Sequence, residues 1–348
     1  MSASIDNLIN VNFTKGRNDL LNFGLKLGGR GDHNPYISPL NRLIILLFSN
    51  NEQGAFYIPR PIVNGTQALF QDAAGTVPVT ADGDPVGLMI DQSPNEHTAV
   101  QSTSAARPTY NASPDRLSLD KVDDALIITV PTGGWNGTMV LATDQGTASY
   151  GVSIPAGAYE LGGQFFPGDA IVGAVFRDGA MTSGEKADAE SYFVGNGATE
   201  SYGAVTDFAL LWHERMDITE YPVINTSSGI DFFATWIRNR NITTFPLLDF
   251  SSAESFFATW KGCGSLEIFQ PNSFDNIKGS DFRDAFDGTN LNQASIDGIL
   301  VSIVTSGIAT GIRLFGQSGG SAPSVGTGQP AIDTLRSRGW TVTVTGGY

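Results

Sequence analysis

Residues 231–236 read DFFATW, and residues 255–260, which begin 24 positions later, read SFFATW. A related stretch, DFALLW, precedes them at residues 207–212, and DFRDAF follows at residues 281–286 after a spacing of 26. Each stretch holds two aromatic residues four positions apart. Recurrence of one ring pattern at a nearly constant interval is the signature of tandem structural repeats. The sequence therefore predicts about four repeats within residues 201–290.

The segments between these stretches also resemble one another. They read ITEYPVIN (218–225), ITTFPLLD (242–249) and LEIFQP (266–271), the last with glutamine directly before proline. We expect each unit to be a short helical turn with its rings on one face, followed by a brief extended segment. One unit cannot bury its rings alone, so neighbours must stack and share a core. The rings expected in this core, rather than in a ladder that stacks on sugars, are Phe208, Trp212, Phe232, Trp236, Phe256, Trp260, Phe282 and Phe286.

The region before the repeats has a different pattern. Residues 55–200 alternate short runs rich in Val, Ile, Thr and Tyr with turns that contain Gly and Pro. This pattern predicts an antiparallel β-sandwich or jelly roll. One helix should interrupt it, starting at Thr182 or Ser183 and ending near Gly195.

The two ends of the chain complete the predicted organisation. Residues 1–54 have few apolar residues for a core of their own, so we expect them to attach to a neighbouring subunit by adding a strand or short helix. Residues 291–348 predict an α/β cap for the repeats, with Asn292 as a helix N-cap. The predicted fold is mainly β, with an α/β solenoid at its end. A length of 348 residues also favours two or three modules with separate cores.

The composition argues against several classes of partner. The formal net charge is −15, whereas nucleic acids and anionic membranes attract cationic surfaces. The longest apolar run, residues 43–48, is too short to span a bilayer, and the first residues lack a signal-peptide pattern. Cys263 is the only cysteine, which excludes a disulfide within the chain and a thiolate metal cage. We expect neither nucleic-acid binding nor membrane insertion.

Several aspartate pairs are candidates for catalytic or calcium-binding groups. A glycan-cleaving enzyme needs two carboxylates about 5–10 Å apart, and the nearest pairs are Asp123 with Asp124 and Asp82 with Asp84. Adjacent residues of an extended segment point to opposite faces, so Asp123 and Asp124 should not share a site. Asp82, Asp84 and Asp169 provide too few oxygen ligands for calcium, and we expect them to form turns.

The sequence also gives no support for a histidine metal site or a serine hydrolase. His33, His97 and His213 are too far apart for a sequence-local metal motif, and no G-x-S-x-G nucleophile motif occurs. The sequence therefore predicts no catalytic residue, no metal site and no cofactor.

Residues that differ between the repeats are better candidates for a binding surface. A shared core requires similar residues in every unit, whereas a surface that contacts a receptor does not. The candidate receptor contacts are Tyr221, Arg238, Asn239, Arg240 and Lys261.

Several blocks resemble a known group of proteins. Residues 69–80 (LFQDAAGTVPVT), 85–91 (PVGLMID), 106–110 (ARPTY) and 119–125 (LDKVDDA) are similar to a module of tail-fibre and other virion proteins of bacteriophages. Residues 176–185 (FRDGAMTSGE) resemble the end of that module, which is similar to laminin-G and concanavalin-like sandwiches. The array, with FPLLDFSS at residues 245–252, resembles BspA-type leucine-rich repeats. The resemblance covers about residues 55–348.

The resemblance implies a virion component, namely a tail-fibre or baseplate-associated adhesin that contributes to host attachment. Residues 1–54 would then bind other virion proteins, and the distal modules would contact a host-surface glycan or protein. Copies would associate, for example as a trimer, although no coiled-coil heptads enforce that state. Two alternatives remain open: a purely architectural head-fibre or decoration subunit, and a tailspike enzyme that depolymerises glycans.

Overall fold

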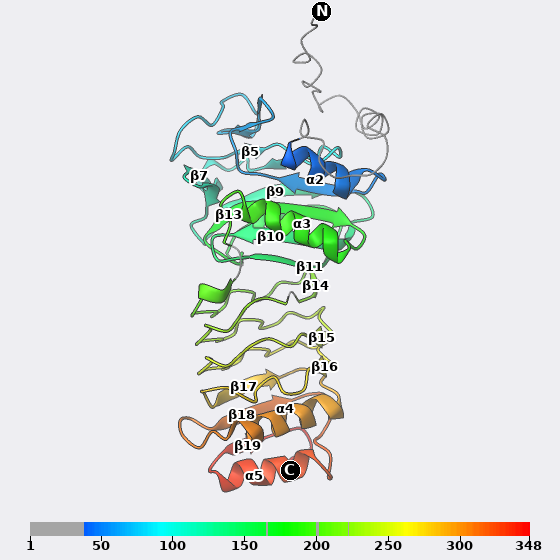
Figure 1. The fold of residues 1–348 in the computed structure, drawn as a ribbon, viewed down its shortest axis with the longest axis vertical. Helices are drawn as coiled ribbons and strands as arrows, with labels where there is room; N and C mark the ends of the chain where they lie inside the picture. Colours follow the sequence, from blue (N-terminus) through cyan, green and yellow to red (C-terminus); the bar gives the residue numbers. More distant parts are fainter. Residues whose placement is uncertain (1–37, 165, 200–201, 222) are drawn as a thin grey trace, which may run out of the picture.

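The protein is mainly β, which confirms the predicted class. The structure is a computed structural model that describes residues 38–164, 166–199, 202–221 and 223–348. This part of the chain contains four α-helices and several β-sheets. Figure 1 shows an elongated molecule, with a layered β-domain at one end, a stack of thin coils in the middle and two helices at the other end.

The larger sheet of the β-domain is antiparallel and has seven strands. They are β1 (Gly54–Tyr57), β7 (Thr109–Ala112), β8 (Asp115–Ser118), β10 (Trp135–Thr143), β11 (Thr147–Ile154), β13 (Ala170–Asp178) and β14 (Ile218–Glu220). Their order is β14-β11-β10-β13-β8-β7, and β1 also pairs with β13. The sheet therefore incorporates a strand, β14, that comes from the first repeat.

The second sheet of the β-domain is also antiparallel. Its strands are β4 (Leu69–Phe70), β5 (Leu88–Met89), β6 (Ala99–Val100), β9 (Ala125–Val130) and β12 (Gly157–Gly162), in the order β12-β9-β6-β5-β4. A separate hairpin joins β2 (Ile62–Val63) to β3 (Thr66–Gln67). The ring of Tyr159 in β12 lies 5.4 Å from that of Phe176 in β13, so the two sheets pack face to face.

The larger sheet is buried on both faces. In β10, Met139 and Leu141 belong to the core between the sheets, whereas Val140 and Ala142 belong to a core under helices α2 (Pro39–Phe48) and α3 (Ser183–Val194). Burial on both sides explains why β10 and β13 read as nearly continuous apolar runs instead of alternating ones.

Helix α3 begins where the sequence predicted. The Thr182 side chain accepts a hydrogen bond from the Glu185 amide, and the Glu185 carboxylate accepts one from the Thr182 amide. This reciprocal capping box satisfies two amides that would otherwise lack partners. The helix ends at Val194 before Gly195, as expected.

Helix α2 corrects the interpretation of the first 54 residues. Residues 1–37 of that segment lie outside the described residues. Ser38 caps the helix by accepting from the Asn41 amide at 3.2 Å, and residues 39–48 bury their apolar face against the protein's own sheet. Residues 39–48 therefore belong to the β-domain, and attachment of the preceding residues to a neighbouring subunit stays a prediction.

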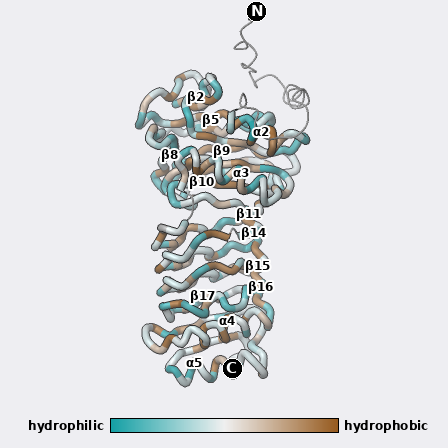
Figure 2. The backbone as a smooth tube through the Cα atoms, in the orientation of Figure 1, coloured by the Kyte–Doolittle hydropathy of each residue, from teal (hydrophilic) through white to brown (hydrophobic). Residues whose placement is uncertain are grey.

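Four coils follow the β-domain, and we number them by their starting residues. Asp207 begins the first coil, Asp231 the second, Ser255 the third and Asp281 the fourth; parallel β-bridges join these residues in that order. Further parallel pairing joins β15 (Thr244–Phe245) of the second coil to β16 (Ile268–Phe269) of the third. Hydrophobic segments recur through the stacked coils in Figure 2.

The ring-bearing stretches are not the short helical turns that the sequence predicts. In the second coil, the amides of Phe232, Ala234 and Trp236 donate to carbonyls of the third coil at 2.9–3.0 Å. The intervening Thr235 and Ile237 donate instead to carbonyls three residues back. An α-helix would direct every amide to the carbonyl four residues back. The first three stretches are therefore series of tight turns whose alternate amides bond to the next coil, whereas the fourth forms strand β17 (Asp281–Asp287).

Backbone dihedral angles explain the four-residue period. Positive φ recurs at every fourth residue of each stretch, for example at Ala234 (50°) and Arg238 (58°) in the second coil. The third coil has the same angles at Ala258 (55°) and Gly262 (74°). One full turn pattern thus takes four residues, and rings spaced by four point to the same side.

Those rings form continuous internal columns. Ring centroids of Trp236 and Trp260 lie 5.6 Å apart, and those of Trp260 and Phe286 lie 4.9 Å apart with nearly parallel planes. The same stacking joins Phe232 to Phe256 at 5.7 Å. All eight rings predicted to be core are buried, which confirms that expectation. The stack is held together by these columns and by the ladder of amide bonds.

The C-terminal residues extend the stack with helices. Strands β17 (Asp281–Asp287), β18 (Leu314–Ser318) and β19 (Thr341–Thr343) pair in parallel, and helices α4 (Gln293–Ser306) and α5 (Gly328–Ser337) connect them. The Asn292 side chain accepts from the Ser295 amide at 2.9 Å, which confirms the predicted N-cap of α4.

One hydrophobic core runs through the β-domain and the coils. Tyr150 of β11 packs edge-on against Trp212 of the first coil, with centroids 5.5 Å apart. Tyr202, in the connection, lies 5.8 Å from Trp212 and 6.3 Å from Phe208. A single cluster of buried residues extends from the sheets to the C-terminal strands. The expectation of separate cores is wrong, because the first coil completes the open edge of the larger sheet.

Candidate functional site

One lateral face of the coils carries an aromatic and charged column. Phe233 of the second coil is 36% exposed, and its ring lies 5.3 Å from that of Phe257 in the third. The Arg283 guanidinium lies 4.7 Å from the centroid of Phe257 and makes two hydrogen bonds with the Asp281 carboxylate. In the second coil, the exposed side chains around this ring are those of Phe233, Arg238 and Arg240, whereas Thr235 is buried.

Three of the five predicted contact residues are at least partly accessible. Arg238 and Arg240 are exposed, and Lys261 is half-buried. Arg238 pairs with Glu214 of the first coil at 2.5 Å, and the Lys261 ammonium lies 2.9 Å from the Asp284 carboxylate of the fourth. These exposed pairs join neighbouring coils and contribute little stability, at most about 1 kcal/mol each.

The other two predicted contacts, Tyr221 and Asn239, are wrong because both are buried. The Asn239 side chain is fully enclosed: its oxygen accepts from the Arg215 amide at 2.7 Å, and its amide donates to the Trp212 carbonyl at 2.9 Å and to the Tyr221 hydroxyl. Burial raises the pKa of Tyr221 well above its ordinary value. A receptor cannot reach either side chain in this arrangement.

A comparison of the coils explains this error. Arg215, Asn239, Cys263 and Thr289 occupy the same internal position, three residues after the second ring of each stretch. Asn239 and Cys263 each bond to the tryptophan carbonyl of the preceding coil, Cys263 through its thiol at 3.0 Å. Several polar side chains can make such bonds, so sequence variation at this position reflects an interior that tolerates exchange.

The buried thiol gives a direct test of this interior. Burial raises the pKa of Cys263 to about 12, so almost no thiolate exists at about pH 8. We expect native protein to resist a disulfide exchange reagent such as DTNB, whereas protein in concentrated guanidinium chloride should release one equivalent of chromophore. Rapid stoichiometric reaction of the native protein would show that the third coil opens readily.

The acidic turn at residues 120–124 departs from expectation. The segment is bent, and carboxylate oxygens of Asp120, Asp123 and Asp124 lie within 4.8 Å of one another. The expectation that Asp123 and Asp124 point apart applied to an extended segment, and the bend at residues 121–123 removes that condition. The Asp120 carboxylate accepts from the amides of Val122, Asp123 and Asp124, and its bond with Val122 lowers its pKa. Burial raises the pKa of Asp124. These bonds give the cluster a turn-forming role.

The remaining predicted groups also form turns or lie apart. Asp84 accepts from the amides of Thr80 and Ala81, and Asp82 accepts from the Ala112 amide. Among the described residues, the acidic turn is the only cluster of three potential metal ligands, so neither His97 nor His213 belongs to one. His33 lies outside the described residues.

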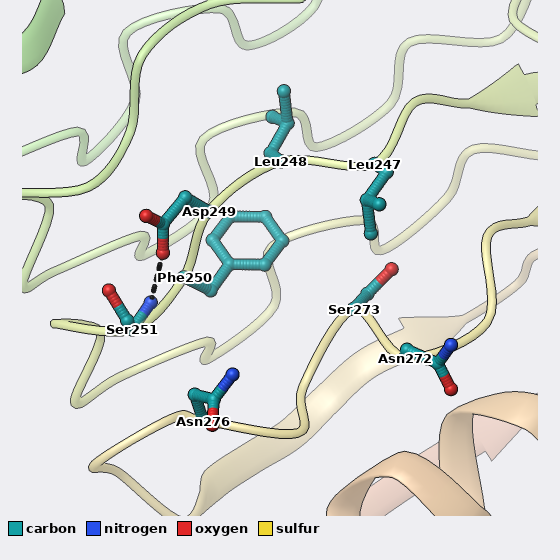
Figure 3. A pocket seen from close by; sticks show the side chains of 8 residues that line it. All are labelled: Leu247, Leu248, Asp249, Phe250, Ser251, Asn272, Ser273 and Asn276. Carbon is teal, nitrogen blue, oxygen red and sulfur yellow. Dashed lines mark hydrogen bonds between the residues drawn. The ribbon is translucent and has the colours of Figure 1, made fainter.

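A pocket opens on another edge of the stack, between the second and third coils (Figure 3). It has a volume of about 360 Å³ and is lined by residues 247–251 and by Asn272, Ser273 and Asn276. Figure 3 shows Asp249, Phe250 and Ser251 close together on one segment, and Ser273 and the two asparagines on the segment below it. The sequence did not predict this pocket. The available signal was Gln270, which separates Phe269 from Pro271 in the third coil, whereas Phe245 directly precedes proline in the second.

Comparisons with protein-family models, with curated proteins and with solved structures found no match to the chain. The resemblance to phage virion modules thus stays a prediction. In the part of the chain that the structure describes, no helix has both the length and the apolar character needed to cross a membrane.

Proposed function

We propose that this chain is a non-enzymatic structural protein of a bacteriophage virion, a tail-fibre or baseplate-associated adhesin. We further propose that the two-sheet domain is laminin-G-like and that the coils are leucine-rich-type repeats. The first support is the similarity of residues 69–125 and of the array to such proteins. In this proposal, residues preceding α2 attach the chain to other virion proteins, and copies associate, for example as a trimer.

The observation that carries the proposal is the unbroken core between β-domain and coils. Tyr150 of β11 contacts Trp212 of the first coil, and β14 of that coil pairs with β11. Such a joint favours a stiff rod over two tethered modules. Helix α2 lies toward one end of this rod and α5 at the other (Figure 1). An adhesin needs this separation, because one end is held by the particle and the rest must reach a host-surface glycan or protein.

Labelling and blocking experiments test the proposal. We expect gold-labelled antibody fragments against residues 201–348 to mark the tail of intact virions, and the same fragments to reduce adsorption to host cells. Fragments against an unrelated virion protein are the control. Labelling of the head without any effect on adsorption would favour the architectural alternative. Release of reducing sugars from host polysaccharide by the purified chain would contradict the non-enzymatic assignment.

A further inference from the structure

We propose that the pocket between the second and third coils binds a neutral saccharide unit. The inference rests on the proposed function, because it assigns the glycan-contacting part of an adhesin to a particular edge of the coils. The residues that line this pocket are not the predicted contact residues, which lie elsewhere on the stack or inside it.

The pocket exists because two neighbouring coils lack polar bridges at this edge. The first and second coils are joined here by the Thr226 hydroxyl, which donates to the Asp249 carbonyl at 2.6 Å. Phe250 occupies the equivalent place in the second coil and has no hydroxyl. Within the described chain, residues 247–251 make no hydrogen bond to residues 270–276. The Phe250 and Phe274 rings stack at 5.7 Å and hold the coils together behind the opening.

The third coil also turns away at this point. Gln270 precedes Pro271 where the second coil has Phe245 followed directly by proline. Asn272 then adopts a positive φ of 64°, and the following residues bond to helix α4 instead of to the second coil: the Phe274 amide donates to the Ser302 hydroxyl at 2.8 Å. The opening is therefore built by particular residues of the third coil.

The lining offers hydrogen-bonding groups with unused capacity. Asn272 and Asn276 are exposed, and their side-chain amides make no hydrogen bond with described residues. Each amide can donate two hydrogen bonds and accept others. Asp249 accepts from the Ser251 amide at 2.9 Å, and its bonding with Ser251 lowers its pKa, so it is ionised at neutral pH. A carboxylate accepts several further bonds, which suits the donating hydroxyls of a sugar.

Apolar groups complete the chemistry that a sugar requires. Leu247 is 56% exposed at the rim, and the buried ring of Phe250 lies behind the polar groups. The C–H faces of a pyranose pack on such surfaces while its hydroxyls bond to amides and carboxylates. The volume of about 360 Å³ falls within the range of about 300–1,000 Å³ that is usual for small-ligand pockets.

Charge distinguishes a neutral sugar from an acidic one. Asp249 is the only charged residue that lines the pocket, and the formal net charge of the whole chain is −15. A sialic acid or a phosphorylated sugar would bring its anion close to this carboxylate without a cation to balance it. The negative charge of the pocket therefore favours uncharged hexoses and N-acetylhexosamines over acidic sugars.

Saturation-transfer NMR on the full chain tests the inference. The probes are glucose, galactose, mannose and N-acetylglucosamine, with N-acetylneuraminic acid as the anionic comparison. We expect at least one neutral sugar to bind, and we expect Asp249→Ala and Asn276→Leu each to weaken that binding by about tenfold or more. The anionic sugar should give no transfer.

Asp231→Ala is the matched control. Asp231 also accepts a hydrogen bond at 2.9 Å from the amide two residues later, Phe233, but it lies outside the pocket. This variant should bind like the wild type. Absence of binding by all four neutral sugars, or equal binding by all variants, would overturn the inference. If antibody fragments still block adsorption in that case, the proposed function stands and only the pocket assignment fails. If a neutral sugar binds but the antibody fragments do not label the virion, the pocket assignment stands and the proposed function fails.

Discussion

Replacing Trp236 with alanine is expected to lower the free energy of unfolding by about 3–5 kcal/mol. The Trp236 ring is 2% exposed and lies 4.8 Å from Phe245 and 5.6 Å from Trp260. Its removal leaves a cavity in the middle of a ring column, and rings held by the coil ladder cannot collapse to fill it. Guanidinium denaturation followed by circular dichroism measures the change.

Phe233→Ala is the control for this prediction. Phe233 lies in the same stretch, but its ring points outward and is 36% exposed, so its loss should cost about 1 kcal/mol. Equal effects of the two substitutions would mean that Trp236 does not lie inside a shared column. That result would contradict the stacked-coil arrangement.

Asp217→Ala is expected to have a comparably large effect, also about 3–5 kcal/mol. Asp217 accepts two hydrogen bonds from the Arg215 guanidinium at 2.6 and 2.8 Å and one from the Tyr159 hydroxyl at 3.0 Å. The Arg215 and Asp217 side chains are only 9% and 13% exposed. Without Asp217, the arginine charge would remain at the joint between β-domain and first coil with no carboxylate to balance it.

The exposed pair of Lys261 and Asp284 supplies the control. Lys261→Ala removes one member of an ion pair whose side chains are 42% and 46% exposed, and it should change the free energy of unfolding by less than about 1 kcal/mol. Chemical denaturation of the two variants at neutral pH compares them directly. An Asp217→Ala variant as stable as Lys261→Ala would show that the joint is hydrated and that the two parts are not rigidly joined.

The same pair predicts the pH dependence of stability. Burial alone would raise the pKa of Asp217, but the Arg215 charge and hydrogen bonds outweigh it and hold that pKa below its ordinary value. The stabilisation is therefore fully present above the unfolded-state pKa of about 3.9. It is lost as the pH falls through the lower folded-state value. Asp217→Ala should reduce the acid-dependent loss of stability in this range.

The sequence predicted the stacking of the coils better than their conformation. The fixed interval and the apolar rings identify the shared core, because only stacked units can bury Trp236 and Trp260. Rings four residues apart suit an α-helix as well as a series of tight turns, so the spacing alone could not distinguish them. Gly262 and Gly288, at matching positions of positive φ, were the available signal. Ala234 and Ala258 adopt the same region without any such signal in their residue type.

The candidate site was less predictable, for two physical reasons. The position of Asn239 varies between repeats because the interior accepts different polar side chains there, and in the sequence this variation looks the same as that of an exposed position. The pocket depends on a contact that is missing between two coils, where Phe250 replaces a bridging hydroxyl and Pro271 is displaced by one residue. Each change is visible in the sequence, but its consequence requires knowing which residues face each other across the stack.

Hydrogen–deuterium exchange tests the central claim, that β-domain and coils form one continuous rigid body, most directly. Peptides covering residues 229–240 carry amides that bond to the third coil, and peptides covering residues 135–154 report on β10 and β11. We predict slow exchange in both, with similar opening free energies. Complete exchange of residues 229–240 within seconds, while residues 135–154 stay protected, would contradict the continuous core and the rod that the proposed function requires.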